Sequence, residues 1–405
     1  MTNERPAAER FEVGLRRVTE LEPDAPLPDS DPRLLDRIAA EIRSGGPMPF
    51  ARFMEIALYD PDGGYYTAQR ADDAAETGPG RAADFLTAPE SHPIFGWAMG
   101  RHLESVWDAL GRPPRFVVRE HGAGTGALAA GILDGLRRSG SSLLGPIRYQ
   151  AIDASPARAA ALRERLERAG VADRLEEPDD RPEAGAVVAN ELLDALPVHR
   201  VEGGPDGSLL ERFVTLGPDG GLETTLGAPS TPELQARLDA EGVRLAPGQP
   251  AEVCLAIDGW VAGAAASLER GELLVIDYGY PAGELYRPER GSTLRAYHRH
   301  RVHADPLVAI GRQDLTAHVD VTAVERAATA AGLEPIVRTR QADFLAALEI
   351  GQLLVGLQSD PLTDLGHYLE ARAALLRMLD PRVTGGFAVL ALGRGLDARA
   401  VRGFG

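Results

Sequence analysis

Lysine is absent from this sequence. All 43 lysine and arginine positions of the 405-residue chain are arginines. Because an arginine guanidinium stays protonated in proteins, this absence excludes a lysine Schiff base or a lysine general base. Cysteine occurs once, as Cys254, which excludes an internal disulfide and a cysteine-based metal cluster. We expect this cysteine to be a small buried apolar residue.

Long hydrophobic runs and an excess of positive charge are also missing. No apolar run has the length needed to span a bilayer, and the first residues mix arginines with glutamates. We therefore expect no membrane span, no targeting segment and a cytoplasmic location in a bacterium. The net charge of −17 argues against a nucleic-acid partner, because affinity for phosphate backbones comes from clustered cations.

One glycine-rich stretch organises the chain. A short apolar run at 116–118 leads to Glu120 and then to glycines at alternate positions, Gly122, Gly124 and Gly126. An alanine- and leucine-rich helical pattern follows, so the stretch predicts a strand, a tight loop and a helix. Glycine adopts a positive φ at little cost and lets the backbone pass close under a bound ligand.

The order of the acid and the glycines indicates which ligand binds. A dinucleotide fingerprint has the spacing G-x-G-x-x-G, with a pyrophosphate on the helix N-terminus. Here the order is acid-x-G-x-G-x-G, and Glu120 beside the loop would repel a phosphate. S-adenosylmethionine, which carries a sulfonium and an ammonium but no phosphate, fits better, although a glycine-rich turn in another α/β protein is the alternative. The motif resembles the first motif of class I S-adenosylmethionine-dependent methyltransferases.

Two further predicted strands end in polar residues. The strand at 147–152 precedes Asp153, and the strand at 185–189 precedes Asn190 and Glu191. Open α/β sheets bind ligands outside the carboxyl ends of their strands. Asp153 can accept both ribose hydroxyls of an adenosine, although it could instead cap the next helix.

The tip of the strand at 185–189 is the predicted methyl-transfer position. An amide at Asn190 and a carboxylate at Glu191 suit an amine, guanidine or similar nucleophile held in line with the methyl group. The alternative is that Asn190 caps a helix and that Asp194 is solvated, and we favour solvation for Asp194.

Several motifs resemble the MidA family, which includes a mitochondrial complex I assembly methyltransferase and bacterial homologues. They are A-L-Y-D-P-x-x-G-Y-Y from residue 57, D-F-x-T-A-P-E from residue 84, N-E-L-L-D-A-L-P-V from residue 190 and Q-D-L-T-A-H-V-D from residue 313. Ala83 stands where the family usually has a glycine. The resemblance covers roughly residues 31–395.

The motifs and the resemblance together predict the site. Glu120 is expected at the methionine ammonium and Asp153 at the ribose. Catalysis is assigned to Asn190 and Glu191. The residues expected to bind the cofactor S-adenosyl-L-methionine are Glu120, Gly122, Ala123, Gly124, Thr125, Gly126, Asp153 and Asn190.

The resemblance also implies an acceptor. Family members of known function methylate an arginine of a respiratory-complex subunit, so a protein or peptide arginine is the first choice. The main alternative is N- or O-methylation of a peptide or small-molecule natural product. A third possibility is an assembly factor that binds the cofactor but works by protein contact. No feature of the sequence indicates an oligomeric state.

The predicted fold is α/β, a Rossmann-like class I methyltransferase with a seven-stranded sheet whose last strand is antiparallel. An N-terminal helical extension and a substrate-side insertion are added to it. The predicted strands lie near residues 116, 149, 186, 211, 273, 336 and 387. The predicted parts are a disordered arm at 1–30, a helical cap at 31–111 and a methyltransferase domain at 112–395, with insertions at about 198–255 and 280–318.

Local patterns predict further elements. Asp31, followed by proline, can cap a helix. Residues 198–201 and 210–214 could form a hairpin. Helical patterns cover 341–354 and 361–379.

Two clusters admit more than one interpretation. His298, His300 and His303 suggest a metal site, but neighbouring arginines oppose a cation, so we predict that no metal binds there. We expect this segment to form a substrate-side lid whose arginines face carboxylates or carbonyls of a peptide. Tyr65 and Tyr66 either pack against the first helix or face the substrate.

Overall fold

A computed structural model describes residues 27–68, 87–298, 301–361 and 363–404. The predicted arm at 1–30 lies mostly outside the described residues. Ala83, Asp84 and His300 lie wholly outside them.

The described part of the chain contains a central sheet of six strands in the order β15-β16-β9-β4-β2-β3. Four neighbouring strands, β9, β4, β2 and β3, run parallel, so their carboxyl ends meet at one edge. The last strand, β16, runs antiparallel to both of its neighbours, which confirms that prediction. The strands are β2 (Phe116–His121), β3 (Ile147–Ile152), β4 (Glu183–Asn190), β9 (Leu268–Asp277), β15 (Glu334–Arg340) and β16 (Ala388–Arg394).

One of the seven predicted strands belongs to a different sheet. The strand β6 (Leu209–Leu216) forms the predicted hairpin with β5 (His199–Gly203), in a separate five-stranded sheet with β1 (Met48–Pro49), β7 (Leu222–Gly227) and β8 (Pro250–Val253). The count of seven was wrong for this reason, because a period of two predicts a strand but not the sheet that it joins. Beside β3, a single parallel bridge between Tyr149 and Leu175 lies where a further edge strand would pair.

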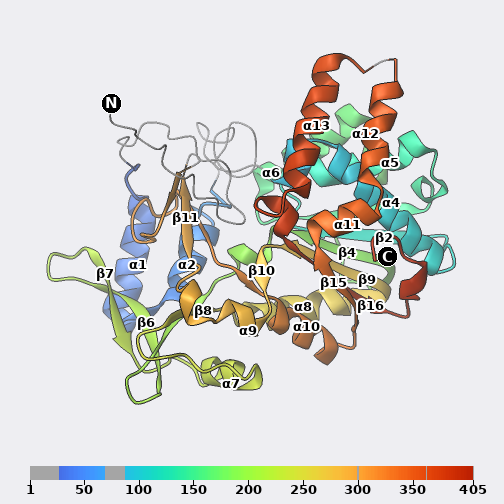
Figure 1. Cartoon of the computed structure of the whole chain (residues 1–405). Helices are drawn as coiled ribbons and strands as arrows, with labels where there is room; N and C mark the ends of the chain where they lie inside the picture. The colour runs from blue at the N-terminus through green and yellow to red at the C-terminus, as the bar shows by residue number, and fades with distance from the viewer. Residues whose placement is uncertain (1–26, 69–86, 299–300, 362, 405) are drawn as a thin grey trace, which may run out of the picture.

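Helices cover both faces of the central sheet (Figure 1). Alternate residues of β4 face opposite cores, because successive side chains of a strand point to opposite faces. Ala186 and Val188 face a core shared with α4, α5, α11, α12 and α13, and Val187 and Ala189 face a core shared with α8 and α10. These helices are α4 (Ile94–Ala109), α5 (Ala127–Ser139), α8 (Ala256–Ala266), α10 (Val321–Ala330), α11 (Gln341–Ala347), α12 (Ile350–Ser359) and α13 (Leu365–Leu379).

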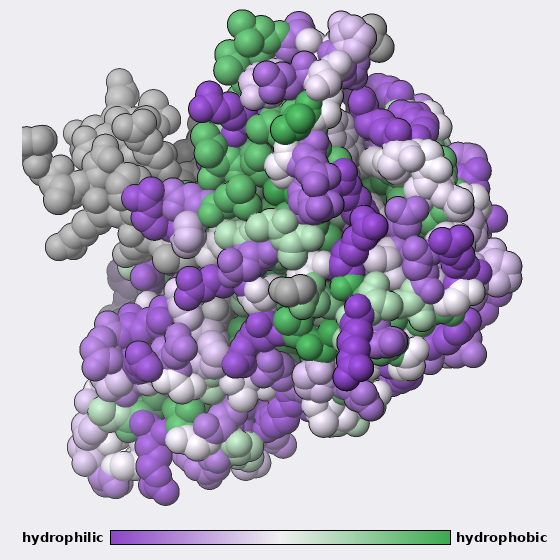
Figure 2. Space-filling view, turned by 45° about the vertical axis from the view of Figure 1, so that its right-hand side comes forward, coloured by the Kyte–Doolittle hydropathy of each residue, from purple (hydrophilic) through white to green (hydrophobic). Residues whose placement is uncertain are grey.

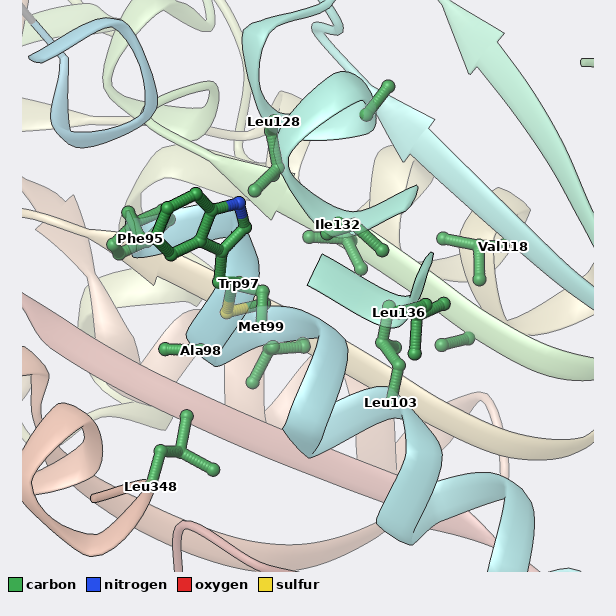
Figure 3. Close-up of a cluster of buried hydrophobic side chains, with 14 of the residues drawn as sticks. Phe95, Trp97, Ala98, Met99, Leu103, Val118, Leu128, Ile132, Leu136 and Leu348 are labelled. Carbon is green, nitrogen blue, oxygen red and sulfur yellow. The ribbon is translucent and has the colours of Figure 1, made fainter. Parts of the chain in front are cut away.

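The helices α4 and α5 pack closely. A Cβ atom at Gly96 would lie 2.6 Å from the Cα of Gly131, so the two backbones meet where neither residue has a side chain. Around this crossing, apolar side chains of both helices and of β2 interdigitate, including Phe95, Met99 and Ile132 (Figure 3). Burial of this kind stabilises a fold by about 1.5–3 kcal/mol for each large side chain.

The N-terminal helices form a second lobe, at the left of Figure 1. The helix α1 (Pro32–Gly45) begins after Asp31, whose carboxylate accepts a hydrogen bond from the backbone N–H of Arg33, as predicted. With α2 (Phe50–Tyr59) it packs on the five-stranded sheet and on the sheet β12-β11-β13, in a core that includes Phe53 and Leu315. The three strands of the smaller sheet are β11 (Arg295–His298), β12 (Arg301–His303) and β13 (Asp314–Thr316). Both insertions therefore share a core with the N-terminal helices.

Short elements connect these parts. They are α3 (Ala88–Ser91), α7 (Glu233–Ala240), α9 (Ala282–Leu285) and the parallel pair β10 (Gly279–Tyr280) and β14 (Val319–Asp320). The longer helix α6 (Pro156–Ala169) lies between β3 and β4 in the chain. No helix in the described ranges is both long and apolar enough to cross a lipid bilayer.

The C-terminal helices differ from the prediction. The single helix expected at 341–354 is broken at Glu349, which has a φ of +56°, into α11 and α12. Together α12 and α13 form a hairpin that projects from the body (Figure 1). Figure 2 shows apolar side chains on the surface of this hairpin. Its residues Val355, Leu365 and Leu376 are 61%, 72% and 60% exposed.

A buried ion pair joins α4 to β9. Nε2 of His102 lies 2.7 Å from Oε2 of Glu272, Nδ1 lies 2.8 Å from the carbonyl oxygen of Arg402, and both paired side chains are fully buried. Burial lowers the pKa of His102, but the charge and hydrogen bond of Glu272 outweigh it, so the pKa is raised above its ordinary value. The raised pKa of His102 therefore contributes its full stabilisation below the ordinary pKa of histidine, while Glu272 is ionised, and less as the pH rises through the raised pKa.

We expect Glu272→Gln to lower the free energy of unfolding by about 3–5 kcal/mol at pH 6, because it leaves a buried cation without its partner. The loss should shrink at pH 9, because the pair weakens as the pH rises through the raised pKa of His102. Urea unfolding at the two pH values measures the difference. The matched control is Glu269→Gln, at an exposed position of the same strand, and an equal loss at both pH values would contradict the assignment.

Candidate active site

A pocket lies at the carboxyl ends of β2, β3 and β4. It is lined by every residue predicted for the cofactor or for catalysis except Gly126. Three other segments also line the pocket. The N-terminal lobe supplies Tyr59, at the end of α2, and Tyr66, in the turn that follows; the segment around α3 supplies Thr87, Pro89 and Glu90, and α8 supplies Trp260. Of these residues, only Tyr66 was considered for the substrate side from the sequence.

The three glycines of the loop all have positive φ values but differ in what surrounds them. Gly122, Gly124 and Gly126 have φ values of +74°, +54° and +80°, as the motif predicted. A Cβ atom at Gly126 would lie 2.6 Å from Leu162, so this glycine permits α5 to pack on α6. A Cβ atom at Gly124 would meet no other protein atom closer than 4.0 Å, which leaves the space above it for a ligand.

Asp153 fastens the loop. Its Oδ2 accepts a hydrogen bond from the N–H of Gly124 at 2.8 Å, and its Oδ1 accepts one from the N–H of Ser155 at 2.8 Å. The cap of α6 is Ser155, whose hydroxyl accepts from the N–H of Arg158. Asp153 therefore does not cap the helix, and its carboxylate holds the loop while lining the pocket.

Glu120 lies at the base of the pocket. It is buried, and the hydroxyl of Tyr149 donates a hydrogen bond to its Oε2 at 2.6 Å. Burial raises the pKa of Glu120 to about 8, although the hydrogen bond from Tyr149 opposes this shift. A cation bound beside it would favour the ionised form, so this position suits a ligand with an ammonium group.

Glu90 links α3 to the loop, and we did not predict this role. Its carboxylate accepts a hydrogen bond from the hydroxyl of Thr125 and two from Arg165, at 3.0 and 3.2 Å. The glutamate of the A-P-E motif thus joins the loop to α6. In the sequence, only the D-F-x-T-A-P-E motif indicated that this glutamate could have a role.

Asn190 and Glu191 lie together at the tip of β4. Nδ2 of Asn190 donates to Oε1 of Glu191 at 3.2 Å, and Oδ1 of Asn190 is buried with no partner among the described residues. Glu191 has a φ of +53°, a strained conformation for a residue other than glycine. Observed strain of this kind is frequent at functional sites.

Asp277, at the end of β9, holds this turn. Its Oδ2 accepts hydrogen bonds from three consecutive backbone N–H groups, those of Leu192, Leu193 and Asp194, at 3.1, 2.8 and 3.3 Å. Asn190 therefore does not cap a helix, since the short 3₁₀ turn that follows is capped by this carboxylate. The strained residue Glu191 is fixed between the β4 ladder and the capped turn.

The expectation that Asp194 is solvated was wrong. The capped turn folds the side chain inward, where it accepts a hydrogen bond from the hydroxyl of Tyr278. Burial raises its pKa to about 6, and the hydrogen bond from Tyr278 opposes the shift.

The paired tyrosines have separate roles. Tyr65 is buried in the core of the N-terminal lobe, whereas Tyr66 lines the pocket. Tyr66 stacks on Tyr59, with ring centroids 5.6 Å apart. The hydroxyl of Tyr59 donates to the carbonyl oxygen of Ala195 at 3.0 Å, and the hydroxyl of Tyr66 donates to Oδ1 of Asp314 at 2.7 Å. The N-terminal lobe is thereby attached to the turn after Glu191.

The histidine and cysteine predictions concern residues outside the pocket. His298 and His303 lie on β11 and β12, and Nδ1 of His298 lies 2.8 Å from the carbonyl oxygen of Arg312. The described residues include no group of three or more histidine, cysteine, aspartate or glutamate side chains placed to hold a metal ion. Cys254 is partly buried, and burial raises its pKa to about 11.

Comparisons with known proteins agree with this geometry. Residues 98–339 match a family described as S-adenosyl-L-methionine-dependent methyltransferases. Mitochondrial protein arginine methyltransferases named NDUFAF7 are similar. The Drosophila melanogaster homologue is 29% identical, over 80% of this chain and 78% of its own length. The Homo sapiens protein is 30% identical, over 78% of this chain and 73% of its own length.

A solved structure is similar over nearly the whole chain. A Burkholderia thailandensis protein crystallised with S-adenosyl-homocysteine has a TM-score of 0.80 and 36% identity, and the match covers 92% of this chain and 96% of that protein. The predicted class I fold is therefore confirmed.

We expect Gly124→Val to lower affinity for S-adenosyl-homocysteine at least tenfold, because the side chain would enter the open space above the loop. The control is Gly140→Val, which has a similar φ of +67° and an equally open Cβ position but lies at the far end of α5. Calorimetric titration measures the affinity of both variants. Equal affinities would show that the glycine loop does not carry the ligand.

Proposed function

The chain belongs to the S-adenosyl-L-methionine-dependent methyltransferases, and from this we propose that it methylates an arginine guanidinium in a protein or peptide. The observation that carries the proposal is Glu191, a carboxylate fixed in a strained conformation beside Asn190 on the pocket wall. The names of the mitochondrial relatives support the same acceptor.

The pocket fits the cofactor. The open space above Gly124 suits the nucleoside, and the buried Glu120 suits the ammonium group. Oδ1 of Asn190, which has no hydrogen-bond partner among the described residues, can accept a hydrogen bond from the ligand. Asp153 lies beside the loop, where its carboxylate can receive ribose hydroxyls. When bound, S-adenosyl-L-methionine supplies a methyl group on a sulfonium, which needs no further activation.

The charges of the pocket favour a cationic acceptor. Four carboxylates line it, and one of them, Glu90, is paired with Arg165. We assign Glu120 and Asp153 to the cofactor, and Glu191, whose Oε1 also accepts a hydrogen bond from the N–H of Ala88 at 3.4 Å, to the acceptor. In a partly desolvated pocket a carboxylate attracts a guanidinium more strongly than it would in water.

Glu191 would orient the acceptor and accept the proton that it loses. Pairing with the guanidinium places positive charge on the nitrogens that the carboxylate contacts and leaves the reacting nitrogen more nucleophilic. As the new C–N bond forms, that nitrogen loses a proton, which the carboxylate can accept. Asn190 orients the group through its amide. Holding reactants in line in this way lowers the barrier without covalent participation of the protein.

The experiment that tests the function uses the whole protein, bacterial lysate fractions and S-adenosyl-L-methionine with an isotopically labelled methyl group. Release of S-adenosyl-homocysteine measures turnover, and mass spectrometry of hydrolysed protein identifies the methylated residue. We expect labelled methylarginine. Label confined to small molecules would support natural-product methylation, and binding without turnover would support an assembly factor; either result would overturn the proposal.

We expect Glu191→Gln to retain affinity for S-adenosyl-homocysteine within a few fold and to lose about 2–4 kcal/mol of transition-state stabilisation, because the amide cannot pair with a guanidinium or accept its proton. The measurement is kcat/KM with the labelled acceptor. The control is Glu164→Gln, an exposed residue of α6. Normal turnover by the Glu191 variant would mean that the acceptor requires no carboxylate.

A further inference from the structure

The N-terminal lobe presents two aromatic rings to the pocket. Tyr59 and Tyr66 stack with an interplanar angle of 23°, and both line the pocket. Their hydroxyls are held by Ala195 and Asp314. Since the hydroxyls are fixed, the ring faces are the parts of these side chains that can meet a ligand.

A guanidinium already lies on one of these rings. The Cζ atom of Arg158 is 5.1 Å from the ring centroid of Tyr66, within the range of a cation–π contact. Arg158 comes from the first turn of α6 and also lines the pocket. Within the described part of the chain no carboxylate forms an ion pair with it. The contact with Arg158 thus shows that this ring face can accept a guanidinium.

The surroundings strengthen the attraction of this ring for cations. The Tyr66 hydroxyl donates to the carboxylate of Asp314, and a phenol hydrogen-bonded to an anion carries more negative charge on its ring. Burial raises the pKa of Tyr66, and the neighbouring carboxylate of Asp314 raises it further, so the phenol stays protonated and keeps donating this bond.

We propose that Tyr66, supported by Tyr59, is the platform that selects the acceptor guanidinium, and that Arg158 occupies this platform until the acceptor displaces it. The inference rests on the proposed function and names the residues that determine its specificity.

The platform and the carboxylate would contact different parts of the acceptor. The Tyr59 hydroxyl reaches the carbonyl of Ala195, in the turn that Asp277 caps after Glu191, so the rings and Glu191 share one wall region. A planar guanidinium can lie flat on a ring while its edge pairs with a carboxylate. A lysine ammonium has no plane to stack, so this arrangement distinguishes arginine from lysine.

The test uses the full chain saturated with S-adenosyl-homocysteine and two probes, N-acetyl-arginine amide and N-acetyl-lysine amide, titrated by calorimetry or ligand-observed NMR. We expect the arginine probe to bind more tightly than the lysine probe. In Tyr66→Leu, affinity for the arginine probe should fall by about 2- to 30-fold, the range of a cation–π contact. Tyr66→Phe keeps the ring and should lose less.

Arg158→Gln is the second variant, because Arg158 is only partly buried and its replacement does not disturb a core. We expect it to bind the arginine probe more tightly, since the competing guanidinium is gone. Unchanged or weaker binding would overturn the displacement. The control is Tyr368→Leu, a tyrosine on α13 outside the pocket.

Two further results would overturn the platform. The first is that Tyr66→Leu binds the arginine probe as tightly as the wild-type protein does. The second is a parallel loss of affinity for S-adenosyl-homocysteine, which would place Tyr66 on the cofactor. Once an acceptor is identified, Tyr66→Leu should raise KM more than it lowers kcat. Failure of the proposed function is distinguishable, because the wild-type protein would then form no methylarginine whatever the probes show.

Discussion

The candidate active site depends on one carboxylate oxygen. Oδ2 of Asp277 accepts three consecutive backbone N–H groups and so fixes the turn after β4, which carries Glu191 in its strained conformation. A residue with a positive φ persists only where the surrounding structure over-determines it. Here the parallel ladder from β4 to β9 and the capped turn do so from both sides. The conformation of Glu191 therefore depends on a side chain of the neighbouring strand.

The sequence predicted the parts of the site that depend on local pattern. The loop after β2, Asp153 after β3 and Asn190 after β4 lie where strand-end reasoning placed them, because parallel strands bring their carboxyl ends to one edge. The roles of these residues in binding and catalysis stay predictions. The positive φ values of the glycines followed from the motif alone.

The features that were missed depend on tertiary contacts. The sequence pattern around Asp194 predicts an exposed, solvated side chain. Only the turn that Asp277 caps directs this side chain into the protein. Glu90 lies in a motif, but its bond to Thr125 requires α3 to lie against the loop. The strand near residue 211 has the right pattern for a sheet, yet it pairs with β5 and β7, because pairing partners are not encoded in a period of two.

The wall of the pocket comes from two stretches of chain that differ in kind. Tyr59 and Tyr66 belong to a lobe with its own core, whereas the glycine loop follows a strand of the central sheet. A substitution in that lobe can reshape one wall while the glycine loop keeps every contact. On our proposal, homologues with an identical glycine motif can therefore diverge in what they methylate, and an exchange of N-terminal lobes between two of them would change the tyrosine wall while the glycine loop and Glu191 stay in place.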